Sequence, residues 1–396
     1  MTHAFSLTPT PPANAFVSAA ERSKKQECFP LDLFFCENCS HLQLLDVVDP
    51  ALLFENYVYV SGTSPVFVKH FQDYADALIK RYGLRAGGLA VDIGSNDGTL
   101  LRFFKEAGFK VLGIDPAKDI AARATASGIE TLPAFFTPEL ARKLVKKHGP
   151  AAVITGNNVF AHADDLKGIA QGVREWLAPD GIFAFEVSYL ADVYNKTLFD
   201  TIYHEHLAYH SVKPLRDFFE ANGLELIDVQ RVDSHGGSLR GIVQKAGGPR
   251  KTSNSVGETI RMEDQLGLHR AETFRAYAAK IDQLKQHLGA LLHGLKSKGK
   301  KIAAFGAPAK ATTLMYHFGL GPEVIDFIVD DSPLKQNLYS PGLHIPVVPS
   351  SSIAAEKPDY LLVLAWNFAD SIIAKNKAFK DAGGHFIVPL PQVELR

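Results

Sequence analysis

The sequence predicts an α/β fold with a doubly wound parallel sheet, and two observations support this. Between residues 67 and 248, short apolar runs such as 181–185 alternate with helix-like stretches. A glycine-rich turn, Gly94–Gly98, follows the apolar run 89–93 and leads into the helix-like pattern 100–105. Strand, turn and helix in that order place backbone N–H groups at the carboxyl edge of the sheet, where α/β folds bind ligands.

A second glycine turn repeats this pattern near the C-terminus. The turn Gly306–Lys310 follows another apolar run, and a later strand-like run, 324–329, ends in Asp330 and Asp331. A helix N-terminus beside a lysine suits a phosphate, while Asp330 or Asp331 suits a ribose or a lysine partner. Two such turns predict a cofactor in one domain and a nucleotide-bearing substrate near the other. The alternative is a Rossmann-like domain kept only as scaffold.

The polar stretch 249–255 predicts a domain boundary. We therefore expect an N-terminal module over residues 1–66, a central domain over 67–248 and a C-terminal domain over 249–396. Apolar residues recur at helical spacing over 266–295, with charged residues between them. This spacing predicts a bracing helix.

The residue in the middle of the first turn distinguishes between nucleoside cofactors. The dinucleotide fingerprint G-x-G-x-x-G needs a glycine there so that the backbone can approach a pyrophosphate, and this chain has Asn96. S-adenosylmethionine has no pyrophosphate, so the turn favours this cofactor over NAD. Asp115 follows the next strand-like run, about 20 residues beyond the first glycine, where a carboxylate can bind a ribose diol. The alternative is a strand-turn-helix corner without a ligand.

Composition excludes several classes of partner. The chain has 396 residues, 46% apolar and 21% charged, which is enough for two or three domains with sizeable cores. A net charge of -1 provides no basic field for nucleic acid. The first residues lack the pattern of a signal peptide, and no apolar run approaches the ~20 residues of a membrane helix. We expect a cytoplasmic protein with neither nucleic acid nor membrane as a partner.

The cysteines suggest half of a metal site. All three, Cys28, Cys36 and Cys39, lie in the first tenth of the chain, which argues against a secreted disulfide framework. Cys36 and Cys39 have the spacing of half a zinc knuckle, whereas a structural zinc site normally needs four ligands. Cys28 or His41 could add a ligand. The alternative is a zinc-free turn or a degenerate knuckle.

Several separated motifs together resemble a known family, the S-adenosylmethionine-dependent C-methyltransferases that act on nucleotide-linked keto-deoxysugars in bacteria. The resemblance covers nearly the whole chain, and the order of the motifs makes it specific. It implies an N-terminal zinc-binding module, then a class I methyltransferase Rossmann-like domain and a C-terminal Rossmann-like domain that helps to hold the sugar nucleotide. The family's upstream CxxC pair has no counterpart before Cys28, so the expectation is either a degenerate zinc-binding module or a chain that begins late. The motifs are Cys36–Cys39, Tyr57–Tyr59 with Ser61–Gly62, Asp92–Gly98, Tyr203–His206, His235–Ser238 and Gly306–Lys310.

The stretch Tyr203–His206 gathers proton-handling side chains, as catalysis requires. Carbon beside a sugar ketone becomes nucleophilic only after its proton is removed, so a base must form an enolate in line with the sulfonium methyl. The resemblance implies His206 as that base, Glu205 as its orienting or stabilising partner and Tyr203 as the donor to the ketone oxygen. His204 and His235 are reserve candidates for the base, and Tyr209 for substrate contact.

The resemblance also implies two sets of binding residues. The expected cofactor pocket is shaped by the first turn and by Asp115, with Tyr57 and Tyr59 closing over the sulfonium because an aromatic face favours a cation. Phe135–Phe136 and Asn157–Asn158 are further candidates for its lining. The expected cofactor residues are Gly94, Asn96, Gly98, Asp115, Tyr57 and Tyr59, and the expected substrate residues are His235, Gly306, Lys310, Asp331 and Lys335, with His344 as an added polar contact.

Three other functions compete with this interpretation. A sugar O-methyltransferase would use the same cofactor site and the same base. An NAD-dependent dehydrogenase is disfavoured by Asn96. A sugar-nucleotide-binding protein without catalysis would keep the glycine turns and would not need Tyr203, Glu205 and His206 together.

Overall fold

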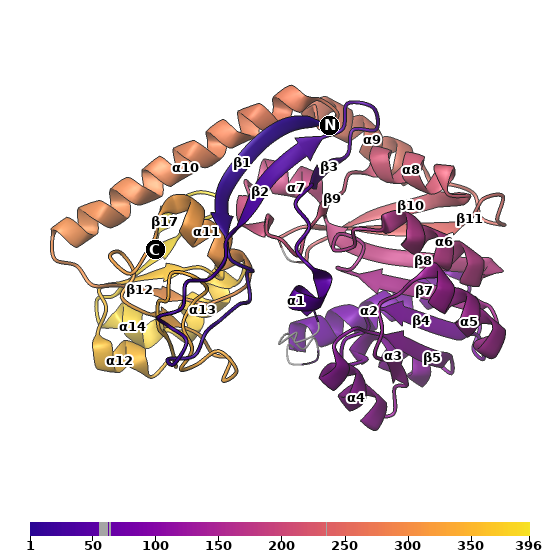
Figure 1. The fold of residues 1–396 in the computed structure, drawn as a ribbon, viewed down its shortest axis with the longest axis horizontal. Coiled ribbons are helices and arrows are strands. Elements are labelled where there is room, and N and C mark those ends of the chain that lie inside the picture. The colour runs from indigo at the N-terminus through magenta and orange to yellow at the C-terminus, as the bar shows by residue number, and fades with distance from the viewer. Residues whose placement is uncertain (55–61, 63–64, 235) are drawn as a thin grey trace.

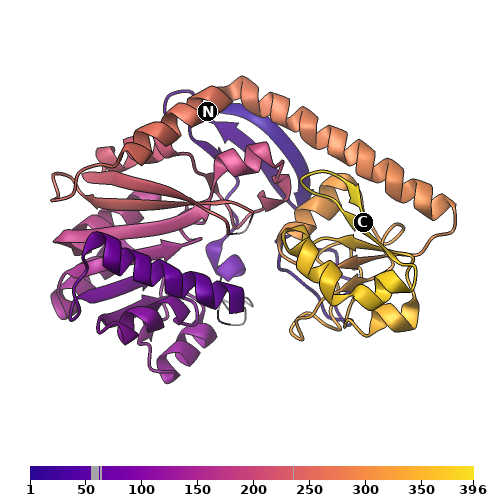
Figure 2. The same ribbon diagram turned by 180° about the vertical axis from the view of Figure 1, so that it is seen from behind.

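The computed structural model describes residues 1–54, 62, 65–234 and 236–396. The chain forms two α/β lobes, a central lobe and a C-terminal lobe, with a small N-terminal sheet between them and one long helix across both (Figure 1). From behind, the same helix spans the top of the molecule, and α2 lies in front of the central sheet (Figure 2).

The central lobe contains a seven-stranded sheet of order β10-β11-β8-β7-β4-β5-β6. Strands β8 to β6 in this order are parallel, while β11 and β10 are antiparallel to their neighbours. The strands are β4 (Leu89–Ile93), β5 (Lys110–Ile114), β6 (Thr131–Leu132), β7 (Ala151–Asn157), β8 (Leu177–Ser188), β10 (Leu224–Val232) and β11 (Ser238–Lys245).

Helices cover both faces of this sheet because its strand residues alternate between two cores. Ala90 and Val153 belong to one buried cluster with α2 and α3, whereas Val91 and Ile154 belong to another with α5 and α6. This arrangement confirms the predicted α/β fold class. The helices are α2 (Pro65–Tyr82), α3 (Thr99–Glu106), α4 (Lys118–Ala126), α5 (Pro138–His148), α6 (Leu166–Trp176), α7 (Leu190–Asn195), η2 (Phe199–Thr201) and α8 (Val212–Ala221).

The C-terminal lobe is built on a six-stranded sheet of order β14-β13-β12-β15-β16-β17. All pairs are parallel except β16 with β17, as a Rossmann-like domain requires. Its elements are β12 (Ile302–Phe305), α11 (Lys310–Phe318), β13 (Ile328–Val329), β14 (Val347–Val348), α12 (Ser352–Glu356), β15 (Tyr360–Val363), η3 (Trp366–Phe368), α13 (Ala369–Lys375), α14 (Lys377–Asp381), β16 (His385–Val388) and β17 (Glu394–Leu395).

The N-terminal sheet is antiparallel, with order β1-β2-β3-β9. Its fourth strand, β9 (Ala208–Tyr209), comes from the central part of the chain and directly follows the stretch Tyr203–His206. Alternate residues of β2 are buried in its core. Its other elements are β1 (Thr2–Thr10), β2 (Phe29–Phe35) and β3 (Leu42–Leu44), followed by α1 (Pro50–Phe54). The predicted domain limits at residues 66 and 248 stay a prediction.

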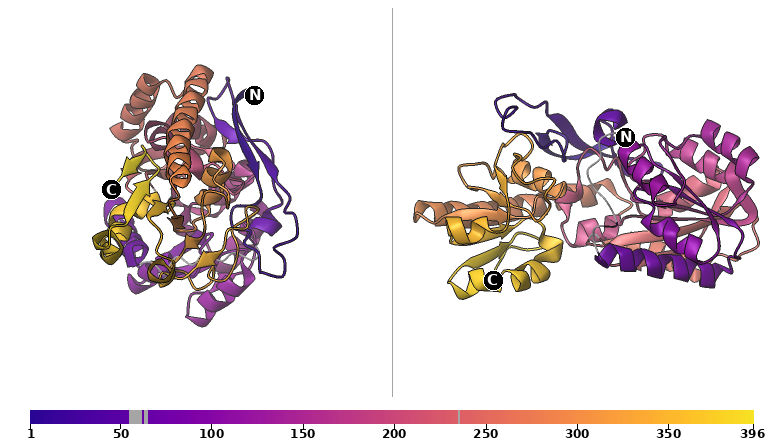
Figure 3. Two further views of the ribbon diagram at one scale, coloured as in Figure 1. Left: turned by 90° about the vertical axis from the view of Figure 1, so that its left-hand side faces the viewer. Right: turned by 90° about the horizontal axis from the view of Figure 1, so that it is seen from below.

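Two helices connect the lobes. Helix α9 (Asn254–Leu266) packs on β10, and α10 (Ala271–Ser297) runs from the central lobe along β1 to the C-terminal lobe. Viewed from below, the two lobes lie side by side, with N-terminal chain along the C-terminal lobe (Figure 3). Among the described residues, none of the helices is long and apolar enough to cross a membrane.

Candidate active site

The first glycine turn has a backbone that most residues cannot adopt. Gly94, Asn96 and Gly98 have φ of 68°, 49° and 77°. A Cβ at Gly94 would lie 2.3 Å from Val159 Cγ2, and one at Gly98 would lie 2.8 Å from Ile129 Cγ2. Asparagine tolerates the left-handed region, so the sequence of the turn fits its shape.

Asp115, at the carboxyl end of β5, accepts hydrogen bonds that fix this turn. Its Oδ2 accepts the backbone N–H of Asn96 at 2.8 Å, and its Oδ1 accepts that of Ala117 at 2.9 Å. Burial raises the pKa of Asp115, and the two backbone donors oppose the rise. A carboxylate has about four acceptor sites, so Asp115 can still accept from a ribose hydroxyl.

Asp97 also contributes to the turn, although the glycine pattern of the sequence does not distinguish it. Its Oδ1 accepts from Thr99 N at 3.2 Å and from Thr99 Oγ1 at 2.7 Å, at the start of α3. Its Oδ2 accepts from Gly62 N at 2.9 Å. Asp97 therefore ties the turn to Gly62. Tyr57 and Tyr59 lie outside the described residues.

Glu186 is the centre of a buried cluster at the carboxyl end of β8. The sequence did not predict this cluster. Glu186 accepts from Arg240 Nε at 2.7 Å, and its other oxygen lies 2.8 Å from His70 Nε2. Arg240 also lies over the Tyr74 ring, 3.9 Å from its centroid. Burial alone would raise the pKa of Glu186, but His70 and Arg240 together lower it. These two partners thus favour the ionised carboxylate, at the same edge of the central sheet as the first glycine turn.

A second buried acid lies under the first turn. Asp92 Oδ1 accepts from Thr155 Oγ1 at 2.6 Å, which joins β4 to β7. Burial raises the pKa of Asp92 to about 7, opposed by Thr155 and assisted by the charge of Asp115.

His206 and Tyr203 form the centre of the candidate catalytic group. His206 Nδ1 lies 2.7 Å from the Thr201 carbonyl oxygen, so this nitrogen donates and Nε2 is the acceptor in the neutral ring. The Tyr203 hydroxyl lies 3.1 Å from that Nε2. Burial lowers the pKa of His206 to about 4, although the Thr201 carbonyl opposes this. At neutral pH the ring therefore has a lone pair with which to accept a proton.

His162 lies against His206 and was not predicted. The two rings stack with centroids 4.9 Å apart. Burial lowers the pKa of His162 well below its usual value, and the charge of His206 lowers it further. Its position beyond the carboxyl end of β7 was the available signal, because side chains that follow parallel strands gather at one edge of the sheet.

The other residues of the stretch face different elements. The Glu205 carboxylate is 2% exposed and accepts from Asn14 Nδ2 at 2.8 Å. Burial raises the pKa of Glu205 to about 7, and Asn14 opposes the rise. His204 Nε2 lies 3.2 Å from the Phe29 carbonyl oxygen on β2, and Tyr209 is buried on β9. The predicted roles of Glu205, His204 and Tyr209 stay predictions.

The second glycine turn reproduces the geometry of the first. Gly94 N donates to Ile114 O and Gly306 N to Val329 O, each at 2.7 Å. Asp330 takes the place of Asp115: its Oδ2 accepts from Ala307 N at 2.7 Å and its Oδ1 from Ser332 N at 2.8 Å.

The neighbouring acid, Asp331, turns to the edge of the lobe. It pairs with Lys375 Nζ at 2.6 Å and accepts from Ser350 Oγ at 2.5 Å. The sequence alone did not distinguish Asp330 from Asp331 as the acid for a ribose. The geometry favours Asp330 for that role.

Two lysines lie at the second turn. Lys310 Nζ is 3.4 Å from the Trp366 ring centroid and donates to Asn367 Oδ1 at 2.9 Å. Burial lowers the pKa of Lys310 to about 8, opposed by Asp200. Lys335 Nζ donates to the Ala307 carbonyl at 2.8 Å. These two of the predicted substrate residues thus lie together with Gly306.

Two glycines of the motif His235–Ser238 are closely packed, and Gly236 lies against the same tryptophan. A Cβ at Gly236 would lie 3.0 Å from Trp366, and one at Gly237 would lie 2.3 Å from Asp192 Cγ. Both glycines are therefore required by close packing. His235 itself lies outside the described residues.

Comparisons with known proteins agree with this organisation. Three family models match in series: a putative zinc binding domain over residues 1–54, a methyltransferase domain over 67–229 and a C-methyltransferase C-terminal domain over 233–391. The C-methyltransferase NovU of Streptomyces niveus is 37% identical over 383 residues, which cover 97% of this chain and 91% of NovU. This chain belongs to that C-methyltransferase family. It is an S-adenosylmethionine-dependent methyltransferase.

Solved structures match parts of this C-methyltransferase. An S-adenosylmethionine-dependent methyltransferase from Clostridium acetobutylicum is 14% identical, with a TM-score of 0.37 over 46% of this chain and 92% of that one. Magnesium protoporphyrin IX methyltransferase from Synechocystis is 15% identical, with a TM-score of 0.34 over 46% of this chain and 82% of that one.

The N-terminal residues of this C-methyltransferase do not fit a structural zinc site. Cys36 and Cys39 lie together, whereas Cys28 lies beside Tyr316 of α11 and the His41 ring packs against His210. Among the described residues, no three His, Cys, Asp or Glu side chains are grouped to hold a metal. Two thiols are half of the ligands that structural zinc needs.

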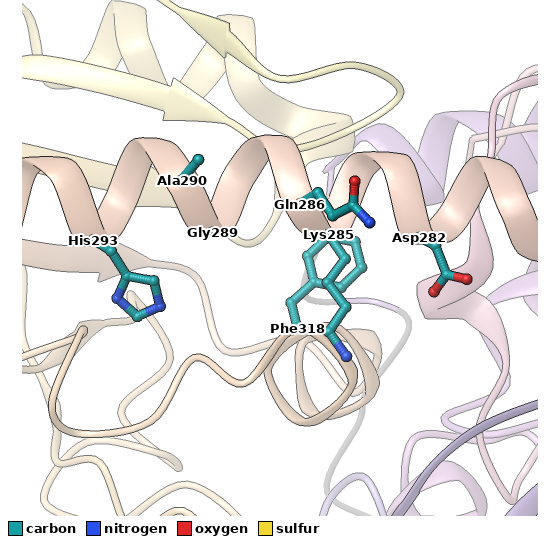
Figure 4. Close-up of a pocket in the computed structure, with 7 residues that line it drawn as sticks. All are labelled: Asp282, Lys285, Gln286, Gly289, Ala290, His293 and Phe318. Atoms are coloured by element: carbon teal, nitrogen blue, oxygen red, sulfur yellow. The ribbon is translucent and has the colours of Figure 1, made fainter.

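A surface pocket on α10 is separate from the candidate site. It has a volume of about 450 Å³ and faces the end of α11 (Figure 4). None of the predicted site residues lines it. Its lining residues are Asp282, Lys285, Gln286, Gly289, Ala290, His293 and Phe318.

Proposed function

We propose that this C-methyltransferase methylates the carbon beside the ketone of a nucleotide-linked 4-keto-deoxysugar. The observation that supports this best is the pair His206 and Tyr203, a neutral imidazole with its Nε2 lying 3.1 Å from a phenol. Such a pair can remove a proton from carbon and donate to oxygen within one small site.

His206 has the role of general base in this proposal. Its Nε2 takes the proton from the carbon beside the ketone, and the C–H electron pair becomes the enolate. The Thr201 carbonyl, 2.7 Å from Nδ1, orients the ring and stabilises the imidazolium that forms. The Tyr203 hydroxyl moves its hydrogen bond from Nε2 to the ketone oxygen as negative charge develops there.

The residues of the first turn fit S-adenosylmethionine. Gly94, Asn96 and Gly98 would shape the pocket, and Asp115 would accept from the ribose hydroxyls. Bound there, the cofactor supplies an electrophilic methyl group on a sulfonium. The positive φ of these three residues fixes the shape of the turn against which the cofactor would lie.

The second turn would hold the nucleotide of the substrate. Gly306 starts the turn, Asp330 occupies the position that Asp115 has in the central lobe, and Lys310 and Lys335 provide positive charge for a diphosphate. The relative NovU is named a C-methyltransferase, and the similarity covers 91% of its length. This supports a shared type of chemistry.

Mass spectrometry of nucleotide-linked 4-keto-deoxysugars incubated in deuterated water tests the proposal. We expect deuterium uptake without S-adenosylmethionine and a gain of one methyl mass with it. A methyl gain without exchange would instead indicate O-methylation. If no sugar of the panel gives either deuterium uptake or a methyl gain, the proposed substrate class is contradicted.

The role of His206 needs its own variant. His206→Ala should keep cofactor affinity and lose exchange of the acidic sugar proton. Unchanged exchange in this variant would exclude His206 as the base.

A further inference from the structure

An N-terminal strap, residues 11–17, leaves β1 and lies on the C-terminal lobe (Figure 1). Thr312 Oγ1 of α11 donates to Ala13 O at 3.0 Å. Gln26 Nε2 donates to Ala15 O at 2.8 Å. Val17 and Tyr339 exchange two backbone hydrogen bonds, of 3.1 and 2.9 Å. These contacts fix the strap to the lobe that carries the second glycine turn.

Asn14 is the strap residue whose side chain reaches the candidate catalytic stretch. Its Nδ2 donates to Glu205 Oε1 at 2.8 Å, across almost half the length of the chain. Glu205 is almost fully buried, and a buried carboxyl without a hydrogen-bond donor is costly. The backbone on both sides of Asn14 is held, at Ala13 and Ala15, so the amide is presented in a fixed position.

We propose that Asn14 is a positioning residue for Glu205, so that the N-terminal strap completes the acid/base group from the C-terminal lobe. This rests on the proposed function, with His206 as the base, and on the role that the family resemblance predicts for Glu205 as the residue that orients or stabilises His206. The amide N–H stabilises the carboxylate form of Glu205, and its attachment to the strap sets where that carboxylate lies.

In this proposal the N-terminal module has a structural role that does not require a metal. Its cysteines do not fit a structural zinc site, yet the module keeps a packed core and pairs β3 with β9, directly after Tyr203–His206. β1 and the strap carry Asn14 to Glu205 within the same stretch. The N-terminal part of the chain therefore contacts the catalytic stretch at Glu205 and the strand that follows it at β9.

The surroundings of Glu205 make its protonation sensitive to this one donor. The titratable groups on its own stretch are Tyr203, His204 and His206, with His162 stacked on His206; the preceding η2, which carries Asp200, packs on α11, which carries Lys310 and His317. The causes that set its pKa are burial, which raises it to about 7, and the Asn14 amide, which opposes the rise. Without the amide, more of Glu205 is protonated at neutral pH.

The test is the pH profile of sugar-proton exchange, measured as kcat/KM for the wild type, Asn14→Ala and the isosteric Asn14→Asp. We expect the acid limb of the profile to move to higher pH in both variants, and exchange at pH 7 to fall about tenfold, in line with the loss of a hydrogen bond to a charged group. Affinity for S-adenosylmethionine should not change. Ser18→Ala is the matched control, since Ser18 follows the strap and bonds only with exposed Glu21 in the described structure.

Glu205→Gln separates failure of this inference from failure of the proposed function. If Glu205→Gln exchanges like the wild type, the proposed role of Glu205 fails. If Glu205→Gln is impaired while both Asn14 variants keep the wild-type profile, the positioning role of Asn14 is overturned. Adding Asn14→Ala to Glu205→Gln should change the profile no further. Should Asn14→Ala fail to fold, Asn14→Asp keeps the side-chain volume and supplies the same measurement.

Discussion

Trp366 and Asp200 join the two lobes directly: the indole Nε1 donates to Asp200 Oδ2 at 2.5 Å, and Asp200 is fully buried. Asp200 begins the run that leads through the Thr201 carbonyl to His206. Thr313 Oγ1 of α11 adds a hydrogen bond of 2.8 Å to Ile202 O, the next residue of that run. The C-terminal lobe thus anchors the backbone on which the candidate base depends.

Trp366→Phe is expected to lower both stability and exchange. Burial raises the pKa of Asp200, with Lys310 and Trp366 opposing the rise, and the variant removes one of these two partners. Leaving a buried acceptor without its donor costs about 1–3 kcal/mol, which urea unfolding would measure. Phe368→Ala, at a half-exposed neighbour, is the control. Equal unfolding midpoints for Trp366→Phe and the wild type would show that this bond does not contribute.

Gly237→Ala is expected to destabilise the protein more than an alanine at an unconstrained glycine. The backbone φ of Gly237 is 138°, and the new Cβ would lie 2.3 Å from Cγ of Asp192, which is buried and ion-paired to Arg231. Gly83 has φ of 63° with no atom within 4 Å of a Cβ. Gly83→Ala should therefore cost about 1 kcal/mol of backbone strain, and Gly237→Ala several times that. Comparable free energies of unfolding would contradict the packing argument.

The sequence identified the parts of the site that local pattern encodes. Gly94, Asn96 and Asp115 were recognisable because a glycine turn and the acid after the next strand stand at fixed spacing, and the structure joins them by a hydrogen bond. The doubled turn at Gly306 was recognisable for the same reason.

The missed residues depend on contacts between distant segments. His162 reaches His206, and Asn14 reaches Glu205, only once three sheets have assembled. Periodicity and spacing describe one element at a time, so at most they place His162 at the carboxyl edge of the sheet, and they do not pair either residue with its partner. Likewise, Asp330 and Asp331 are adjacent in sequence, and only the direction in which β13 ends distinguishes their environments.

Stability below neutral pH should depend on the adjacent rings of His41 and His210. Their ring centroids lie 5.5 Å apart, and burial lowers the pKa of His41 to about 4 and that of His210 to about 3. Unfolded, each titrates near 6.5. Below that pH the unfolded chain therefore binds more protons than the folded protein, and the free energy of unfolding falls as the pH drops from 6.5 toward 4.

A variant separates this effect from buried acids that act in the opposite sense. The pKa values of Asp92 and Glu205 are raised to about 7, so protonation of these two groups favours the folded state as the pH falls below 7. His210→Phe should flatten the fall in unfolding free energy between pH 6.5 and 4.5 by up to about 1.4 kcal/mol per pH unit. His385→Phe, at an exposed histidine, is the control. A His210→Phe slope equal to that of the wild type would contradict the assignment.

The purified protein is expected to contain far less than one zinc per chain. Cys36 and Cys39 lie in the turn before β3, where the backbone is already closed by Ser40 N to Cys36 O at 2.7 Å and Cys36 N to His41 O at 2.8 Å. Since protein groups form this turn, chelator treatment should leave the thermal midpoint unchanged, as should Cys39→Ser. Near-stoichiometric zinc by elemental analysis, with a chelator-induced fall in Tm, would show that the module binds metal with other ligands.

Asp115→Asn and Asp330→Asn form a matched pair. Together they test whether the central lobe binds the cofactor and the C-terminal lobe binds the nucleotide of the substrate. Each acid accepts two backbone N–H groups, one from its glycine turn and one from two residues ahead. An asparagine offers one oxygen and an NH2 group, so one backbone donor would face a donor. Asp115→Asn should weaken S-adenosylmethionine binding about tenfold or more with little change in affinity for the nucleotide-linked sugar, and Asp330→Asn should do the reverse. Titration calorimetry with each ligand measures both. Because each variant is the other's control for folding, loss of both affinities in either one would mean that the two turns do not act as separate sites.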